Sequence, residues 1–182
     1  MAETKERLSG LSSETLALAG LSDDAICVLS EYSTPMANVE KLSSVGLFPD
    51  AIKYLAHSLE GRSCIVWSLS CARRLQANAT RVEQNALLSV EKWLAEPTDA
   101  HRRAAQAAAE EARLSSPAGC IAIAVFFSEG SIAPPEVAAV PAPPRIAQKI
   151  AAAGIILAVV EDAEKASDRY RSCVQLGLQA TT

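Results

Sequence analysis

The chain reads PAGCIAIAVFF at residues 117–127, SEGSIA at residues 128–133 and PPEVAAVPAPP at residues 134–144. The first string is almost wholly apolar, which is typical of a helix that lies in a protein core. The last string holds five prolines in eleven residues, and each proline removes a backbone donor and fixes φ at about −65°. We therefore expect a buried helix followed by an extended surface strap, residues 128–145, that is neither helix nor central strand.

Outside this stretch, the composition favours an all-α domain. The 182 residues are 49% hydrophobic but only 4% aromatic, and they include only eight glycines. Alanine and leucine supply most apolar positions, and alanine has the highest helix propensity of all residues. A chain of this length suits one domain with a sizeable core. We expect a single helical domain over residues 36–182, preceded by a weakly structured acidic segment, residues 1–35.

Apolar residues recur at helical spacing along most of the remaining chain. Pro49 suits the first turn of a helix, and Thr80 is placed to cap another. Connections of only a few residues favour antiparallel neighbours. The pattern predicts an antiparallel bundle of about six to seven helices, with an up-and-down arrangement between residues 50 and 114. The expected helices cover residues 50–59, 62–77, 81–95, 100–114, 117–127, 145–160 and 163–178.

Candidate catalytic and metal-binding groups are few. His57 and His101 are the only histidines, and the five cysteines show no metal-ligand spacing such as C-x-x-C. Cys120 is the best candidate nucleophile, with His57 or His101 as its base, because a helix N-terminus lowers the pKa of a thiol. The apolar residues around Cys120 favour a buried, inert thiol instead. We expect no catalytic group, no cofactor and no metal ion.

Charge and hydropathy limit the classes of partner and compartment. The net charge is −4, and no basic residues interleave with aromatic ones, which argues against nucleic-acid binding. The longest apolar run, residues 150–160, is too short to span a bilayer. The first seven residues, MAETKER, are charged and do not resemble a signal peptide. Scattered cysteines suit a reducing compartment, so we expect a soluble cytoplasmic protein.

Two features point to contacts with another protein. Arg102 and Arg103 stand near the start of a helix, where positive charge opposes the helix dipole. They form either a local ion-pair network or a contact for an acidic partner. The strap either covers the bundle or docks a partner chain. The candidate partner-binding residues are Arg102, Arg103, Ser128, Glu129, Ser131, Pro134, Pro135, Pro141, Pro143 and Pro144.

Several runs of sequence resemble a family of small uncharacterised bacterial proteins. The most specific run is FFSEGSIAPP, residues 126–135, with the pattern Phe-Phe-Ser-x-Gly-Ser-x-Ala-Pro-Pro. EKWL (residues 91–94), RRAA (102–105), PAG (117–119) and VPAPP (140–144) fit the same family, and the resemblance covers about residues 35–180. Glu129 stands where a glycine is expected. The resemblance implies cytoplasmic, all-helical proteins without an assigned activity, associated with type VI secretion gene clusters.

Together these observations favour a non-enzymatic interaction protein, an adaptor or a chaperone-like accessory factor. The resemblance implies effector loading in a type VI secretion system, with an effector or a secretion component as the partner. Two alternatives stay open. One is a cysteine-dependent hydrolase or transferase that uses Cys120, and the other is an immunity protein that binds a cognate toxin.

Overall fold

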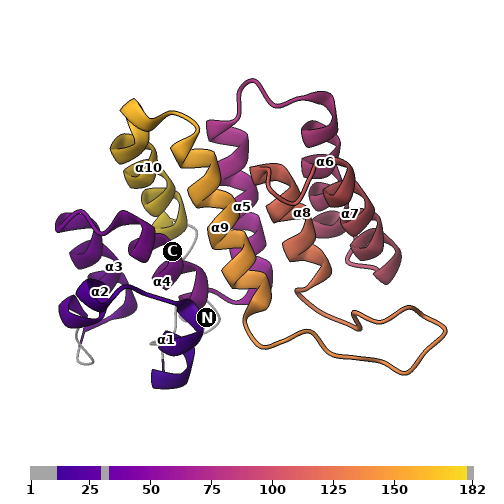
Figure 1. Cartoon of the computed structure of the whole chain (residues 1–182), viewed down its shortest axis with the longest axis horizontal. Helices are drawn as coiled ribbons and strands as arrows, with labels where there is room; N and C mark the ends of the chain where they lie inside the picture. The colour runs from indigo at the N-terminus through magenta and orange to yellow at the C-terminus, as the bar shows by residue number, and fades with distance from the viewer. Residues whose placement is uncertain (1–11, 30–32, 180–182) are drawn as a thin grey trace, which may run out of the picture.

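The computed structural model describes residues 12–29 and 33–179, and within them the chain is all-α, as predicted (Figure 1). Ten α-helices and one short 3-10 helix, η1, make up the regular structure of these residues, which include no β-strand. The elements are α1 (Ser13–Ala19), α2 (Asp23–Val28), α3 (Pro35–Ser44), α4 (Phe48–Ser58), α5 (Gly61–Leu75), α6 (Arg81–Ala95), α7 (Asp99–Glu111), α8 (Pro117–Phe126), α9 (Ile146–Val160), η1 (Ala163–Lys165) and α10 (Ala166–Gln179).

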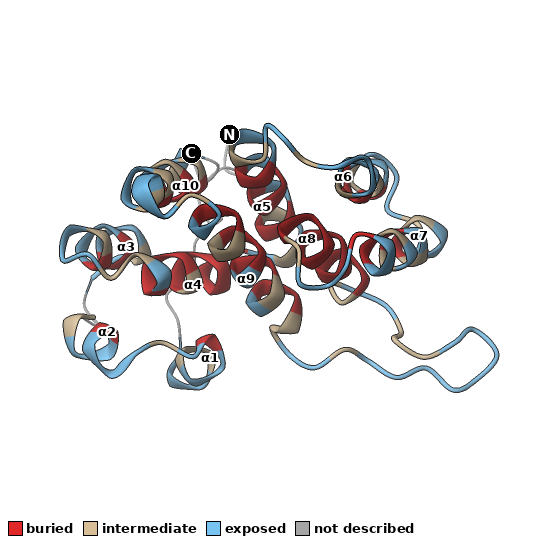
Figure 2. Ribbon diagram, turned by 45° about the horizontal axis from the view of Figure 1, so that its top comes forward, coloured by how far each residue is buried: buried red, intermediate tan, exposed pale blue. Residues whose placement is uncertain are grey.

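The two most apolar helices, α8 and α9, lie at the centre of the bundle (Figure 2). Every residue of α8 is buried, as expected for a helix without a polar face. Gly154 of α9 allows a close approach, because a Cβ there would lie 3.0 Å from Cβ of Cys120 and 3.1 Å from Cγ1 of Ile121. α4 and α5 also pack against α9, and α6 and α7 pack against α8. The core is thus organised around the two helices that flank the strap.

The predicted order of neighbours between residues 50 and 114 is only partly correct. α6 and α7 pack against each other, but α4 packs mainly against α3, α9 and α10. Leu59 and Glu60, which connect α4 to α5, are both extended, with ψ of 147° and 154°. The chain therefore changes direction there without folding α5 back along α4. Burying the strongly apolar α9 decides this arrangement, because removing apolar surface from water is the main driving force for packing.

The segment before residue 36 is more structured than expected in the part that the structure describes. Ser12 and Ser22 cap α1 and α2. The main-chain N–H and the hydroxyl of Ser22 donate to the carboxylate of buried Asp50 at 3.0 and 3.1 Å, and Nζ of Lys53 donates to the Gly20 carbonyl at 3.0 Å. These bonds tie the corner between α1 and α2 to α4. Residues 1–11 and 30–32, also covered by that prediction, lie outside the described residues.

Capping groups place several helix ends where the sequence predicts them. Thr80 caps α6, its hydroxyl accepting from the N–H of Glu83, and its own N–H donates to the Glu83 carboxylate at 2.8 Å. α6 has the predicted bounds, and α3 begins at Pro35 behind the cap of Thr34. Gly61 begins α5, one residue before the expected start, after a connection of only two residues.

α10 completes the core against α4 and α5. The indole N–H of buried Trp67 donates to the main-chain carbonyl of Cys173 at 2.8 Å. A Cβ at Gly177 would lie 2.5 Å from Cδ2 of Leu55, so only glycine fits at this crossing. Within residues 12–29 and 33–179, no helix is both long enough and apolar enough to cross a membrane.

Candidate protein-docking site

The strap, residues 128–145, leaves the end of α8, loops away from the helices and returns to the start of α9 (Figure 1). Residues 134–141 are all exposed (Figure 2), and Val137 has a relative accessibility of 58%. The interpretation of the strap as a cover packed on the bundle is therefore wrong. Its prolines stiffen the loop without support from the core, because their φ angles are set by the ring.

Hydrogen bonds of residues 131–133 and 140–141 close the strap where its two legs meet, at a segment that we call the neck. The N–H of Ile132 donates to the Val140 carbonyl at 2.8 Å. Oγ of Ser131 accepts the N–H groups of Ala133 and Val140 at 3.1 and 3.0 Å. An isolated antiparallel bridge joins Ser131 to Pro141. The exposed residues beyond this neck therefore form a closed loop with a defined position.

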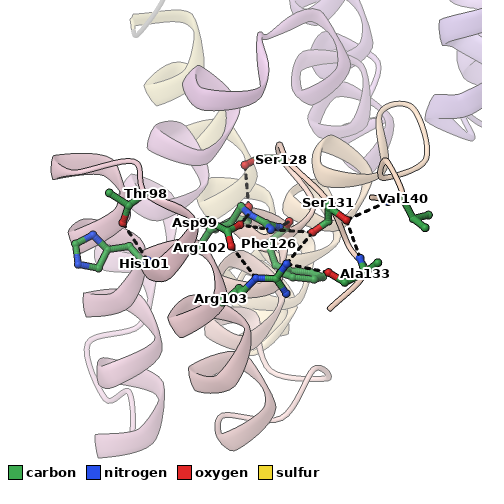
Figure 3. A network of polar contacts seen from close by, with 11 residues as sticks. Thr98, Asp99, His101, Arg102, Arg103, Phe126, Ser128, Ser131, Ala133 and Val140 are labelled. Carbon is green, nitrogen blue, oxygen red and sulfur yellow. Dashed lines mark hydrogen bonds and ion pairs between the residues drawn. The ribbon is translucent and has the colours of Figure 1, made fainter. Parts of the chain in front are cut away.

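A buried arginine anchors the neck to the bundle (Figure 3). Arg102 of α7 is only 1% exposed, and it donates from Nη1 to the Phe126 carbonyl at 2.6 Å and from Nη2 to the Ser131 carbonyl at 2.8 Å. Phe126 ends α8, and the last carbonyls of a helix have no partner inside it. The guanidinium carbon also lies 4.8 Å from the centre of the Phe126 ring. Arg102 thus joins α7, the end of α8 and the strap.

Asp99, in the first turn of α7, holds both arginines from the solvent side. Its Oδ1 accepts from Nε of Arg102 at 3.0 Å, and its Oδ2 accepts from Nε of Arg103 at 2.8 Å. Arg103 also donates to the Ala133 carbonyl at 2.9 Å. The hydrogen bonds from Arg103 and Arg102 hold the pKa of Asp99 below its usual range. These partners compensate the burial of the Arg102 charge.

Gly130 is required by its conformation and by its neighbour. Its φ is +70°, a left-handed conformation that glycine adopts without steric cost. A Cβ at this position would lie 3.2 Å from Nε of Arg102. Glu129, which stands where the family resemblance leads us to expect a second glycine, does not have a positive φ and is exposed. The turn therefore needs one glycine only.

The structure brings Arg102, Arg103 and Ser131 into direct contact. Arg102 is not accessible, so the structure places it in a local ion-pair network and not at an exposed edge. Ser128 donates its hydroxyl to the Val125 carbonyl at 2.8 Å, within the end of α8. Partner binding by the exposed candidates stays a prediction; they are Glu129, Pro134, Pro135, Pro141, Pro143 and Pro144.

Sequence reasoning missed Gly130 and the Phe126 carbonyl as parts of this network. Asp99 was recognisable as a local charge partner, because it stands three and four residues before the two arginines, where side chains on a helix meet. No local signal pointed to the Phe126 and Ser131 carbonyls, which lie 24 and 29 residues beyond Arg102. That pairing depends on how α7 packs against α8.

Cys120 does not have the environment of a catalytic nucleophile. Burial raises the pKa of its thiol, which donates to the Leu114 carbonyl at 3.1 Å. Nδ1 of His57 bonds to the Lys53 carbonyl and Nδ1 of His101 lies 2.9 Å from another main-chain carbonyl. Neither imidazole hydrogen-bonds to a thiol among the described residues. In the same part of the chain, no group of histidine, cysteine and carboxylate side chains could hold a metal ion.

Comparison with known proteins identifies a family but no activity. A model of a family of unknown function, DUF6931, matches residues 38–181, which include the strap and all helices from α4 to α10. The chain matches none of the curated proteins and none of the solved structures with which it was compared. This finding agrees with the resemblance to an uncharacterised family. Since the match extends over well more than half of the sequence, the chain belongs to the family of unknown function DUF6931.

Proposed function

We propose that this protein is a non-enzymatic interaction factor that docks another protein on its proline-rich strap. The observation that carries the proposal is the exposed loop of residues 134–141, held at its neck by the buried Arg102. A segment that is already stiff and positioned loses less conformational entropy when a partner binds it. The strap therefore suits recognition better than a free chain of the same composition.

The strap offers a particular set of contacts to a partner. Its prolines have no N–H group, so a partner meets carbonyl oxygens and apolar surface. Val137 and Val140 are 58% and 47% exposed and add aliphatic side chains to that surface. Proline-rich segments typically dock into grooves lined with aromatic side chains. We infer that the partner presents such a groove.

The biological role follows from the identity of that partner. The family resemblance implies loading of an effector in a type VI secretion system, with this protein as an adaptor or chaperone-like factor. Under the immunity alternative, the partner is a cognate toxin bound on the same surface. Mass-spectrometric identification of the captured protein separates these roles.

Capture from the native host with two matched variants tests the docking site. Val137→Asp places a charge in the exposed loop, whereas Val82→Asp places the same charge at a 43% exposed position of α6. We expect the wild-type protein and V82D to recover the same partner, and V137D to lose it. Recovery of one partner by all three proteins, or by none of them, would exclude the strap as the docking site.

A further inference from the structure

A cavity of about 470 Å³ lies at the base of the strap. Its walls come from the starts of α5 and α9, from the turn after α8 and from the returning leg of the strap. The apolar part of the wall includes Phe127, Pro141 and Pro143, and the polar part includes Arg145 and Gln148. The cavity is therefore open to a ligand that combines an apolar body with a polar end.

Two helix N-termini meet at this cavity. Gly61 begins α5 and Ile146 begins α9, and both residues line the wall. Neither helix is capped by a side chain. The N–H of Ile146 donates to the Pro143 carbonyl at 3.3 Å, and the other first-turn N–H groups are left to bind a ligand or water. Each helix start also carries a partial positive charge of about half an elementary charge. Together they favour an anion at the point where the helices converge.

Two side chains of the wall offer polar groups to a ligand. Gln148 is only 7% exposed and lines the cavity, yet its amide makes no hydrogen bond with any described residue. Its amide atoms are not among the fully buried unpartnered atoms of the described residues, so they face the cavity and its solvent and can bond to a ligand group or to water. Arg145 is half-buried at the same wall, and in the described part of the chain its guanidinium forms no hydrogen bond and no ion pair. Both groups can bind a carboxylate or an amide.

The charges around the cavity indicate how much negative charge a bound anion should carry. Arg145 contributes one positive charge and the two helix starts contribute about half a charge each. Glu129 also lines the cavity and contributes one negative charge. The net charge of the wall is about +1, which matches a single carboxylate better than a phosphate dianion. The prolines and Phe127 supply an apolar wall beside it.

We propose that this cavity binds the C-terminal carboxylate of a partner chain whose last side chain is apolar. The carboxylate bonds to Arg145 and to the first-turn N–H groups of α5 and α9, and Gln148 bonds to the last peptide unit. This inference rests on the proposed function, since it names a second contact of the same partner. Pro141 and Pro143 belong to both the strap and the cavity wall, so one chain can touch both surfaces.

An NMR titration tests the proposal with N-acetyl-alanyl-leucine as the free acid and as its C-terminal amide. We expect the free acid to bind with a dissociation constant of about 1 mM. It should move the backbone amide signals of Gly61, Ala147 and Gln148, and the amide should leave them unchanged. Arg145→Gln should weaken binding at least about tenfold, because it removes a charge-assisted pair. Gln148→Leu, which keeps the volume, should weaken it by about threefold.

Lys149→Gln is the matched control, since it removes one positive charge from an exposed position on the same turn of α9. It should change the affinity by less than about twofold. Equal binding of acid and amide, equal effects of R145Q and K149Q, or no shift at 20-fold the expected dissociation constant would overturn the proposal. Inorganic phosphate is the second probe. If it moves these signals and the free acid does not, the cavity is a phosphate site and the carboxylate assignment is wrong.

The titration and the capture experiment can fail separately. V137D changes the exposed loop and not the cavity wall, so it should bind the free acid like the wild-type protein. Loss of the titration signals alone removes the carboxylate proposal and leaves docking on the strap. Loss of capture alone removes strap docking and leaves a cavity that binds carboxylates.

Discussion

Removing the Arg102 side chain is expected to destabilise the protein and to release the strap. Arg102→Ala deletes two charge-assisted bonds to the carbonyls of Phe126 and Ser131, at 2.6 and 2.8 Å. Each such bond is worth about 1.5–3 kcal/mol, because the carbonyl is otherwise left unsatisfied or must be hydrated. The contact with Asp99 adds little to this, since that side chain is 59% exposed and solvent screens the pair.

The sum predicts a loss of about 3–6 kcal/mol in the free energy of unfolding. In a chain of this size, 1 kcal/mol shifts Tm by about 2–4 °C, so this loss corresponds to a fall of about 6–24 °C in Tm. Arg102→Lys keeps the charge but cannot reach both carbonyls and Asp99 at once, so it should lose about half as much. Arg73→Ala is the control. It removes an exposed ion pair with Glu91 at 2.8 Å and should cost less than about 1 kcal/mol.

Urea unfolding followed by far-UV circular dichroism measures these differences, and hydrogen exchange reports on the strap. The N–H groups of Ile132 and Val140 close the neck, so they should exchange faster in R102A and unchanged in R73A. A destabilisation of R102A within about 1 kcal/mol of R73A, or unchanged exchange at the neck, would refute the role of Arg102 as the anchor.

Three further predictions concern the same region and the cysteines. Gly130→Ala should destabilise the protein by about 1–2 kcal/mol, measured by urea unfolding, because its φ is +70° and a Cβ would crowd Arg102; a neutral effect would contradict this packing. The pKa of Asp99 is lowered in the folded protein, so its contribution is present above its unfolded pKa of about 3.9 and is lost as pH falls through the folded value. Unfolding midpoints between pH 7 and 3 should therefore fall more steeply for the wild-type protein than for Asp99→Asn, and parallel curves would argue against the pair. A thiol reagent at pH 8 should label exposed Cys27 in the native protein. It should reach Cys64 only after unfolding, because burial raises the pKa of that thiol to about 12. Labelling of Cys120 in the native protein would revive the nucleophile hypothesis.

Much of the helical framework could be predicted, because helix ends depend on chemistry within a few residues. Thr80 and Glu83 form a capping box that fixes the start of α6. The short helices α1 and α2 could not be predicted, since helices of six or seven residues persist only with tertiary support. Part of that support is the bond from Ser22 to Asp50, which joins positions 28 residues apart.

The candidate site was predicted less well than the helices. The exposed prolines of the strap follow from composition, because a proline-rich segment can join neither a helix nor a central strand. The position of the strap does not follow from composition. It depends on Arg102, whose sequence context also allowed an exposed contact, and on Gly130, whose left-handed φ is apparent only in the folded turn.

By itself, the amino-acid sequence determined that the chain is helical, where most helices lie and which residues form the strap. Propensity, capping and proline geometry act over one or two turns of chain, so they can be recognised locally. Only the tertiary structure decided that α8 and α9 form the centre, that Arg102 is buried and that the starts of α5 and α9 share one cavity. Those features depend on contacts between residues far apart in the sequence, which packing of the whole apolar core selects together.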